Sequence, residues 1–110
     1  MITATISRTG LKIEGHAGAA PFGYDIVCAG VSALVQTFKA AAEQLTDDAV
    51  KTAVAPESGQ ILGFDWGKGP SEKLSTLVDA LWIGLAMIER EYPEYVKLTL
   101  KSEDAQAWMA

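Results

Sequence analysis

The sequence contains one cysteine and one histidine, Cys28 and His16, and these two side chains offer a definite chemistry. A thiol beside an imidazole can perform acyl transfer, because the imidazole takes the thiol proton and later protonates the leaving group. A plainer interpretation also stands, since a lone cysteine on a helix is often a small buried apolar residue. A metal site is disfavoured, because one cysteine and one histidine supply too few of the usual ligands. Residue types and spacing alone leave the catalytic and structural interpretations open.

The cysteine is expected at the start of a helix. Apolar residues recurring at helical spacing predict a helix over residues 26–44, with Asp25 as its N-cap. Cys28 then lies in the first turn, where free amides and the helix dipole favour a thiolate and can hold an oxyanion. Asp25 has a second candidate role, which is to orient His16. Ser32 lies one turn beyond Cys28 on the same face, and its hydroxyl bonds either within the site or to its own helix carbonyl.

The histidine is expected in a loop that follows two short strands. Apolar and polar residues alternate over residues 2–7 and 11–14, with a Thr9-Gly10 turn between them, which predicts a hairpin. Residues 15–24 are rich in Gly, Ala and Pro, which is typical of a loop. This loop is long enough to return His16 to the start of the helix.

The rest of the chain supplies the elements that must hold these residues in place. Residues 50–55 and 60–66 read as two strands joined by a turn, and residues 96–101 as a last strand. Between them, Ser71 is expected to cap a second amphipathic helix that Pro93 ends. The order ββαββαβ predicts an α+β fold, a mainly antiparallel five-stranded sheet with two helices on one face. We expect residues 1–110 to form a single domain.

Composition narrows the classes of partner. The net charge is −5 and the pI is about 4.7, which disfavours direct binding to nucleic acid and suits a basic peptide. A single cysteine excludes an intramolecular disulfide and fits a reducing compartment. The first residues lack the pattern of a secretory signal, and the longest apolar stretch, Leu77 to Ile88, is too short to span a membrane. We therefore expect a cytoplasmic protein that does not bind a membrane.

Two stretches of sequence resemble a known family. They are Gly15-His16-Ala17-Gly18 and, after a short interval, Gly23-Tyr24-Asp25-Ile26-Val27-Cys28-Ala29-Gly30-Val31-Ser32-Ala33-Leu34. Together they resemble the signature of the ribosomal-processing cysteine proteases, called Prp. The resemblance implies a cysteine protease that removes the N-terminal extension of a large-subunit ribosomal protein, the one numbered twenty-seven. In that interpretation Cys28 is the nucleophile and His16 the general base.

The same resemblance assigns further roles. It implies that Gly15, Asp25 and Ser32 support the catalytic pair or the substrate. It also implies that residues 17–24, with Ala17, Gly18, Gly23 and Tyr24, form a mobile lid over the substrate site. The resemblance also implies a homodimer that needs no cofactor. The alternative function is a ribosome-associated binding module of the same fold whose Cys–His pair is inert.

Two departures from the family pattern do not touch the pair. Gly30 stands where the family often has alanine, and it costs about 1 kcal/mol of helix stability. The glycine marks either close packing at this position or neutral sequence drift. Pro21 fixes one backbone angle of the expected lid.

Overall fold

The computed structural model describes residues 1–15 and 22–100, and it contains the seven elements that the sequence predicts, in the predicted order. These elements are β1 (Ile2–Ile6), β2 (Gly10–Glu14), α1 (Phe22–Leu45), β3 (Lys51–Val54), β4 (Ile61–Asp65), α2 (Glu72–Glu91) and β5 (Val96–Leu100).

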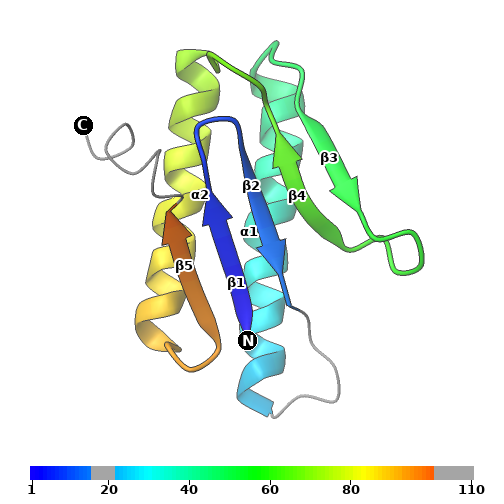
Figure 1. Cartoon of the computed structure of the whole chain (residues 1–110). Coiled ribbons are helices and arrows are strands. Elements are labelled where there is room, and N and C mark those ends of the chain that lie inside the picture. Colours follow the sequence, from blue (N-terminus) through cyan, green and yellow to red (C-terminus); the bar gives the residue numbers. More distant parts are fainter. Residues whose placement is uncertain (16–21, 101–110) are drawn as a thin grey trace.

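The strands form one sheet in the order β3-β4-β2-β1-β5, and both helices cover the same face of it (Figure 1). Three of the neighbouring pairs are antiparallel, and β1 and β5 are parallel. The predicted fold class is confirmed, with the qualification that the sheet is mixed. The parallel pair follows from the chain path, because α2 carries the chain back across the sheet to the edge beside β1.

The core lies between the sheet and the two helices. Along β1 the side chains alternate between buried and half-buried, so that every second residue faces the helices. The buried helical side chains follow the apolar stripes of the sequence: Val27, Val31, Val35, Phe38 and Ala42 on α1, and Leu74, Val78, Leu81 and Leu85 on α2. Phe38 meets Phe64 of β4 edge to face, with ring centroids 4.8 Å apart.

The start of α1 differs from the prediction. The helix begins at Phe22, so Asp25 is its fourth residue and not the N-cap. The last part of the predicted loop, with Gly23 and Tyr24, is therefore helical. The glycine between Phe22 and Tyr24 lowers helix propensity, which is why local sequence favours a later start.

The boundaries of α2 match the prediction. Ser71 is the N-cap, and its Oγ accepts a hydrogen bond of 3.1 Å from the amide of Leu74. The helix ends at Glu91, two residues before Pro93.

The two helices touch through small residues. A Cβ on Gly84 would lie 2.9 Å from Leu34, and a Cβ on Gly30 would lie 3.3 Å from Ile88. Gly30 therefore marks close packing between the helices, one of the two interpretations that the sequence leaves open.

Within the described chain, Ile26–Leu45 of α1 is long and apolar enough to match a membrane span by length and composition. One face of this helix is buried against the sheet, as in the core helix of a two-layer domain.

Candidate active site

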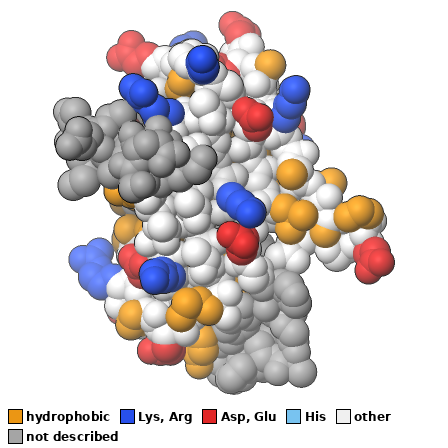
Figure 2. Space-filling model, viewed as in Figure 1, with side chains coloured by type: hydrophobic (Ala, Val, Ile, Leu, Met, Phe, Trp, Pro, Cys, Tyr) orange, Lys and Arg blue, Asp and Glu red, His pale blue; other side chains and the backbone are white. Residues whose placement is uncertain are grey.

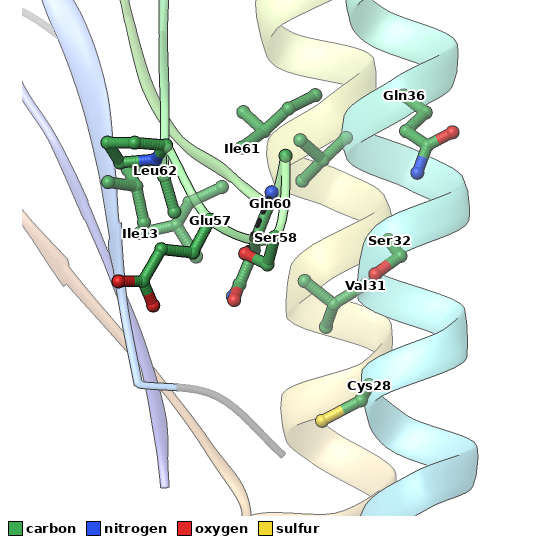
Figure 3. A pocket seen from close by; sticks show the side chains of 14 residues that line it. Ile13, Cys28, Val31, Ser32, Gln36, Glu57, Ser58, Gln60, Ile61 and Leu62 are labelled. Atoms are coloured by element: carbon green, nitrogen blue, oxygen red, sulfur yellow. Dashed lines mark hydrogen bonds between the residues drawn. The ribbon is translucent and has the colours of Figure 1, made fainter. Parts of the chain in front are cut away.

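A groove of about 800 Å³ separates α1 from the β3–β4 hairpin, and Cys28 lies in its wall (Figure 3). The described residues that line it are Ile13 from β2, Cys28, Val31, Ser32, Val35 and Gln36 from α1, and residues 55–62 of the hairpin. Figure 1 shows why the groove exists: the turn of the β3–β4 hairpin projects away from the rest of the sheet. The α1 wall of the groove runs from Cys28 to Gln36, about 12 Å along the helix axis, which is the length of three to four residues of an extended peptide.

Cys28 is half-buried and packs against the edge of the core. Figure 3 shows its sulfur directed away from α1 and into the groove. Because α1 begins at Phe22, Cys28 is the seventh helical residue and lies in the second turn, which corrects the prediction of a first-turn position. The helix dipole acts mainly within the first turn, and amides of the second turn are bonded to carbonyls four residues earlier. The start of the helix therefore stabilises the thiolate of Cys28 less than the sequence predicts.

Ser32 lines the same groove, one helical turn beyond Cys28, as the spacing predicts. Among the described residues its hydroxyl makes no hydrogen bond, so it does not bond back to its helix carbonyl as Thr37 does to Ala33. The hydroxyl is therefore available to a molecule in the groove.

Gly15 follows the last residue of β2 and has a φ of 90°, a conformation that favours glycine. A Cβ at this position would collide with the carbonyl oxygen of Met1. Ile13, two residues before Gly15, lines the groove, so the chain leaves the end of β2 beside the groove. The positive φ and the close approach of Met1 therefore both require a glycine at position 15.

The predicted site residues from His16 to Asp25 fall into two groups. His16, Ala17 and Gly18 lie outside the described residues. Gly23, Tyr24 and Asp25 belong to the first turn of α1, and Asp25 precedes Cys28 by three residues on that helix.

The sequence interpretation missed the hairpin wall of the groove. The turn around Pro56 and Gly59 is visible in the sequence, but its position opposite Cys28 depends on how β4 pairs with β2, which no local pattern encodes. Gln36 was also missed, although its spacing of four from Ser32 places both on one helix face.

In the described part of the chain, no group of three or more His, Cys, Asp or Glu side chains is arranged to hold a metal ion.

A family model described as "Cysteine protease Prp" matches residues 1–97. The chain belongs to the Prp family of cysteine proteases. A curated relative, the "Ribosomal processing cysteine protease Prp" of Bacillus subtilis (strain 168), is 30% identical over 108 residues, which cover 90% of this chain and 96% of the relative.

Solved Prp structures have the same fold. The S. aureus protease in complex with a covalently linked product peptide has a TM-score of 0.81 at 27% identity, covering 92% of this chain and 100% of that one. The same protease with a substrate peptide has a TM-score of 0.82 at 26% identity and the same coverage. A Streptococcus mutans protein has a TM-score of 0.78 at 31% identity, covering 92% and 96%. This Prp-family chain is a cysteine endopeptidase.

Proposed function

We propose that this protease removes the N-terminal extension of a large-subunit ribosomal protein, the one numbered twenty-seven, with Cys28 as nucleophile and His16 as general base. The observation that carries the proposal is the position of Cys28, whose sulfur faces a groove suited to an extended peptide (Figure 3). The names of the relatives support it: one is a ribosomal processing protease, and another was crystallised with substrate and product peptides.

In the proposed mechanism, the Cys28 thiolate attacks the carbonyl carbon of the scissile bond and forms a carbon–sulfur bond. The carbon–nitrogen bond then breaks, and protonated His16 gives its proton to the leaving amine. His16 next takes a proton from water, whose oxygen attacks the thioester carbon and displaces the sulfur. Because Cys28 lies in the second helical turn, this mechanism assigns the stabilisation of the thiolate mainly to His16.

Asp25 and Ser32 are proposed as supporting residues. Asp25 lies one helical turn before Cys28, in the turn whose free amides favour a negative charge. Ser32 presents its hydroxyl to the groove one turn after Cys28. The segment with Ala17 and Gly18 is proposed to close over the bound peptide, as the resemblance implies, whereas Gly23 and Tyr24 belong to the first turn of α1.

The test is cleavage of a peptide that spans the extension junction of that ribosomal protein. The wild-type protein should cut it at one bond, and Cys28→Ser and His16→Ala should each abolish cutting. Thr37→Ala, a change at an exposed position of α1 outside the described groove lining, should leave cleavage unchanged. If wild type and both variants bind the peptide and none cuts it, the chain is a binding module and the proposal is wrong.

A second measurement separates the roles of the two residues. Iodoacetamide should alkylate Cys28 at neutral pH, and His16→Ala should slow that reaction, because the imidazole holds the thiolate. Equal alkylation rates would assign thiol activation to another group.

The same proposal includes the setting of the enzyme. We propose a cytoplasmic homodimer that needs no cofactor and binds neither nucleic acid nor membrane directly. The net charge of −5 and the single cysteine support this setting. Light scattering coupled to size exclusion measures the oligomeric state, and a monomer at micromolar concentration would contradict the dimer.

A further inference from the structure

The groove beside Cys28 has an uneven distribution of charge. Among the described residues that line it, Glu57 is the single charged side chain, and the others are apolar or neutral polar. Glu57 is exposed and makes no ion pair with any residue in the described part of the chain. Figure 3 shows its carboxylate on the hairpin side of the groove, across from the α1 side chains Cys28 and Ser32. A lone carboxylate at the margin of an apolar groove attracts a cation from the molecule that fills it.

The backbone around Glu57 is held by a set of hydrogen bonds. The amide of Ala55 donates to the carbonyl of Gln60 at 2.8 Å, and the amide of Gly59 donates to the carbonyl of Ala55 at 2.9 Å. The amide of Gln60 also donates to Ser58 Oγ at 3.2 Å. Gly59 supplies the positive φ of 72° that this turn needs. The carboxylate is therefore carried by a defined turn, which keeps it beside the groove.

The exposed surface around the turn is largely apolar. This is an unusual setting for Glu57, an acidic residue that makes no ion pair with the described residues. The hairpin exposes apolar side chains, among them Val54 at 49% and Leu62 at 40%, and they gather over the projecting hairpin in Figure 2. One explanation is that an acidic residue at such a turn has no role beyond keeping the sheet edge soluble. Glu57, however, lies in the wall of the groove that contains the thiol.

We infer that Glu57 is a specificity residue, which selects a peptide substrate that carries a positively charged side chain at one fixed position from the scissile bond. The inference rests on the proposed function, because it takes the groove to be the peptide-binding site of the protease. It adds the chemical class of the selected residue and the side chain that selects it. The effect is moderate, since an exposed ion pair contributes little and is weakened by salt.

The experiment is a lysine scan of a peptide that the enzyme cleaves. Each position in turn carries lysine or glutamine, and kcat/KM is measured for wild type, Glu57→Gln, Glu57→Lys and the control Glu94→Gln. Glu94 is exposed, lies in the turn between α2 and β5 and is not among the described groove residues, so its variant matches the charge change alone. Thermal unfolding of each variant checks the fold.

Wild type and Glu94→Gln should prefer lysine over glutamine at one position by about fivefold, mainly through KM, and less at high salt. Glu57→Gln should remove this preference, and Glu57→Lys should invert it. The same peptides should show the same order of affinity for Cys28→Ser, which reports binding without cleavage.

Cleavage of the peptides with equal lysine preference in wild type and Glu57→Gln overturns the inference and leaves the proposed function intact. Equal loss of preference in Glu57→Gln and Glu94→Gln assigns the effect to net charge and also overturns it. Absence of both cleavage and binding by wild type overturns the proposed function together with this inference.

Discussion

The two edges of the sheet are built in opposite ways. At the β5 edge, two outward amides are bonded within the chain: Val96 donates to the carbonyl of Tyr92 at 3.2 Å, and Leu98 donates to Glu89 Oε2 at 2.7 Å. At the other edge, the β3–β4 hairpin projects from the molecule, and apolar side chains gather over it (Figures 1 and 2). Val54 of β3 and Leu62 of β4 are exposed there.

The β5 edge contributes to the stability of the fold, whereas the hairpin contributes to substrate recognition. An open strand edge invites pairing with other chains, so a chain that closes one edge with its own groups keeps that edge structural. The projecting hairpin leaves a groove against α1, and the half-buried Cys28 lies in it. We therefore expect side-chain truncations at the β5 edge to affect stability alone, and side-chain truncations in the groove wall of the hairpin to affect cleavage.

The largest effect is expected where the hairpin joins the sheet, at Gly63. A Cβ there would lie 2.5 Å from the carbonyl oxygen of Leu11 and 3.4 Å from Lys12 Cα, both backbone atoms. Gly63→Ala must push β4 away from β2, which should lower the free energy of unfolding by about 3 kcal/mol and the Tm by about 15 °C.

Gly59→Ala at the hairpin turn is the matched control, because a Cβ there meets no atom within 4 Å and only the φ of 72° is strained. It should cost about 1 kcal/mol, measured by thermal unfolding with circular dichroism. A smaller loss at Gly63 than at Gly59 would mean that the hairpin is not tightly joined to β2.

Truncating one leucine in β5 and one in the hairpin tests the division directly. Leu98 packs against the core, so Leu98→Ala should lower the free energy of unfolding by about 2 kcal/mol and leave kcat/KM unchanged. Leu62 is 40% exposed and lines the groove, so Leu62→Ala should cost little stability and reduce kcat/KM about fivefold, equivalent to about 1 kcal/mol of lost contact. The same effects on stability and rate at both positions would remove the distinction between the edges.

The closing hydrogen bond of the β5 edge gives a third, smaller effect. Glu89→Ala leaves the amide of Leu98 without its acceptor, and we expect a loss of about 1.5 kcal/mol with normal cleavage. Glu89→Gln keeps an acceptor oxygen and should lose less. Glu91→Ala, an exposed change two residues along α2, provides the baseline, and a Glu89→Ala variant as stable as this control would show that the bond does not close the edge.

These two edges also show what the sequence can and cannot predict. The alternation in β1 and the apolar stripes of α1 and α2 report burial directly, so the elements, their order and the fold class follow from local pattern. Ser71 and Pro93 mark the limits of α2 because capping and the missing proline amide are local effects.

The start of α1 shows the limit of such local signals. Asp25 has the residue type of a cap, yet the helix begins at Phe22, four residues before the predicted start at residue 26. That shift moves Cys28 from the first turn to the second. The spacing of Cys28 and Ser32 correctly places them in one wall of the groove, whereas Glu57 could not be assigned, because its wall is formed by contacts between strands distant in sequence.

The base of the hairpin gives the smallest expected effect. Asp48, three residues before β3, accepts hydrogen bonds from the hydroxyl and the amide of Ser71, the N-cap of α2, the latter at 2.9 Å. The hydroxyl of Ser71, followed by its backbone amide, lowers the pKa of Asp48 below its ordinary value of 3.8. These bonds tie both ends of the hairpin segment to the start of α2, while its turn stays open.

A carboxylate whose pKa is lower in the folded state stabilises the fold at pH values above its unfolded pKa, and loses this effect as the pH falls through the folded pKa. Wild type should therefore have a higher Tm than Asp48→Asn near pH 7, and the gap should close below pH 3.8. Asp47→Asn is the control, since the neighbouring exposed carboxylate makes no hydrogen bond to the described residues. The Tm difference between wild type and this variant should not depend on the hydrogen bonds between Asp48 and Ser71. If the Asp48→Asn gap stays constant down to pH 2, Asp48 does not anchor the hairpin by its charge, and the open edge is held by the β2–β4 pairing alone.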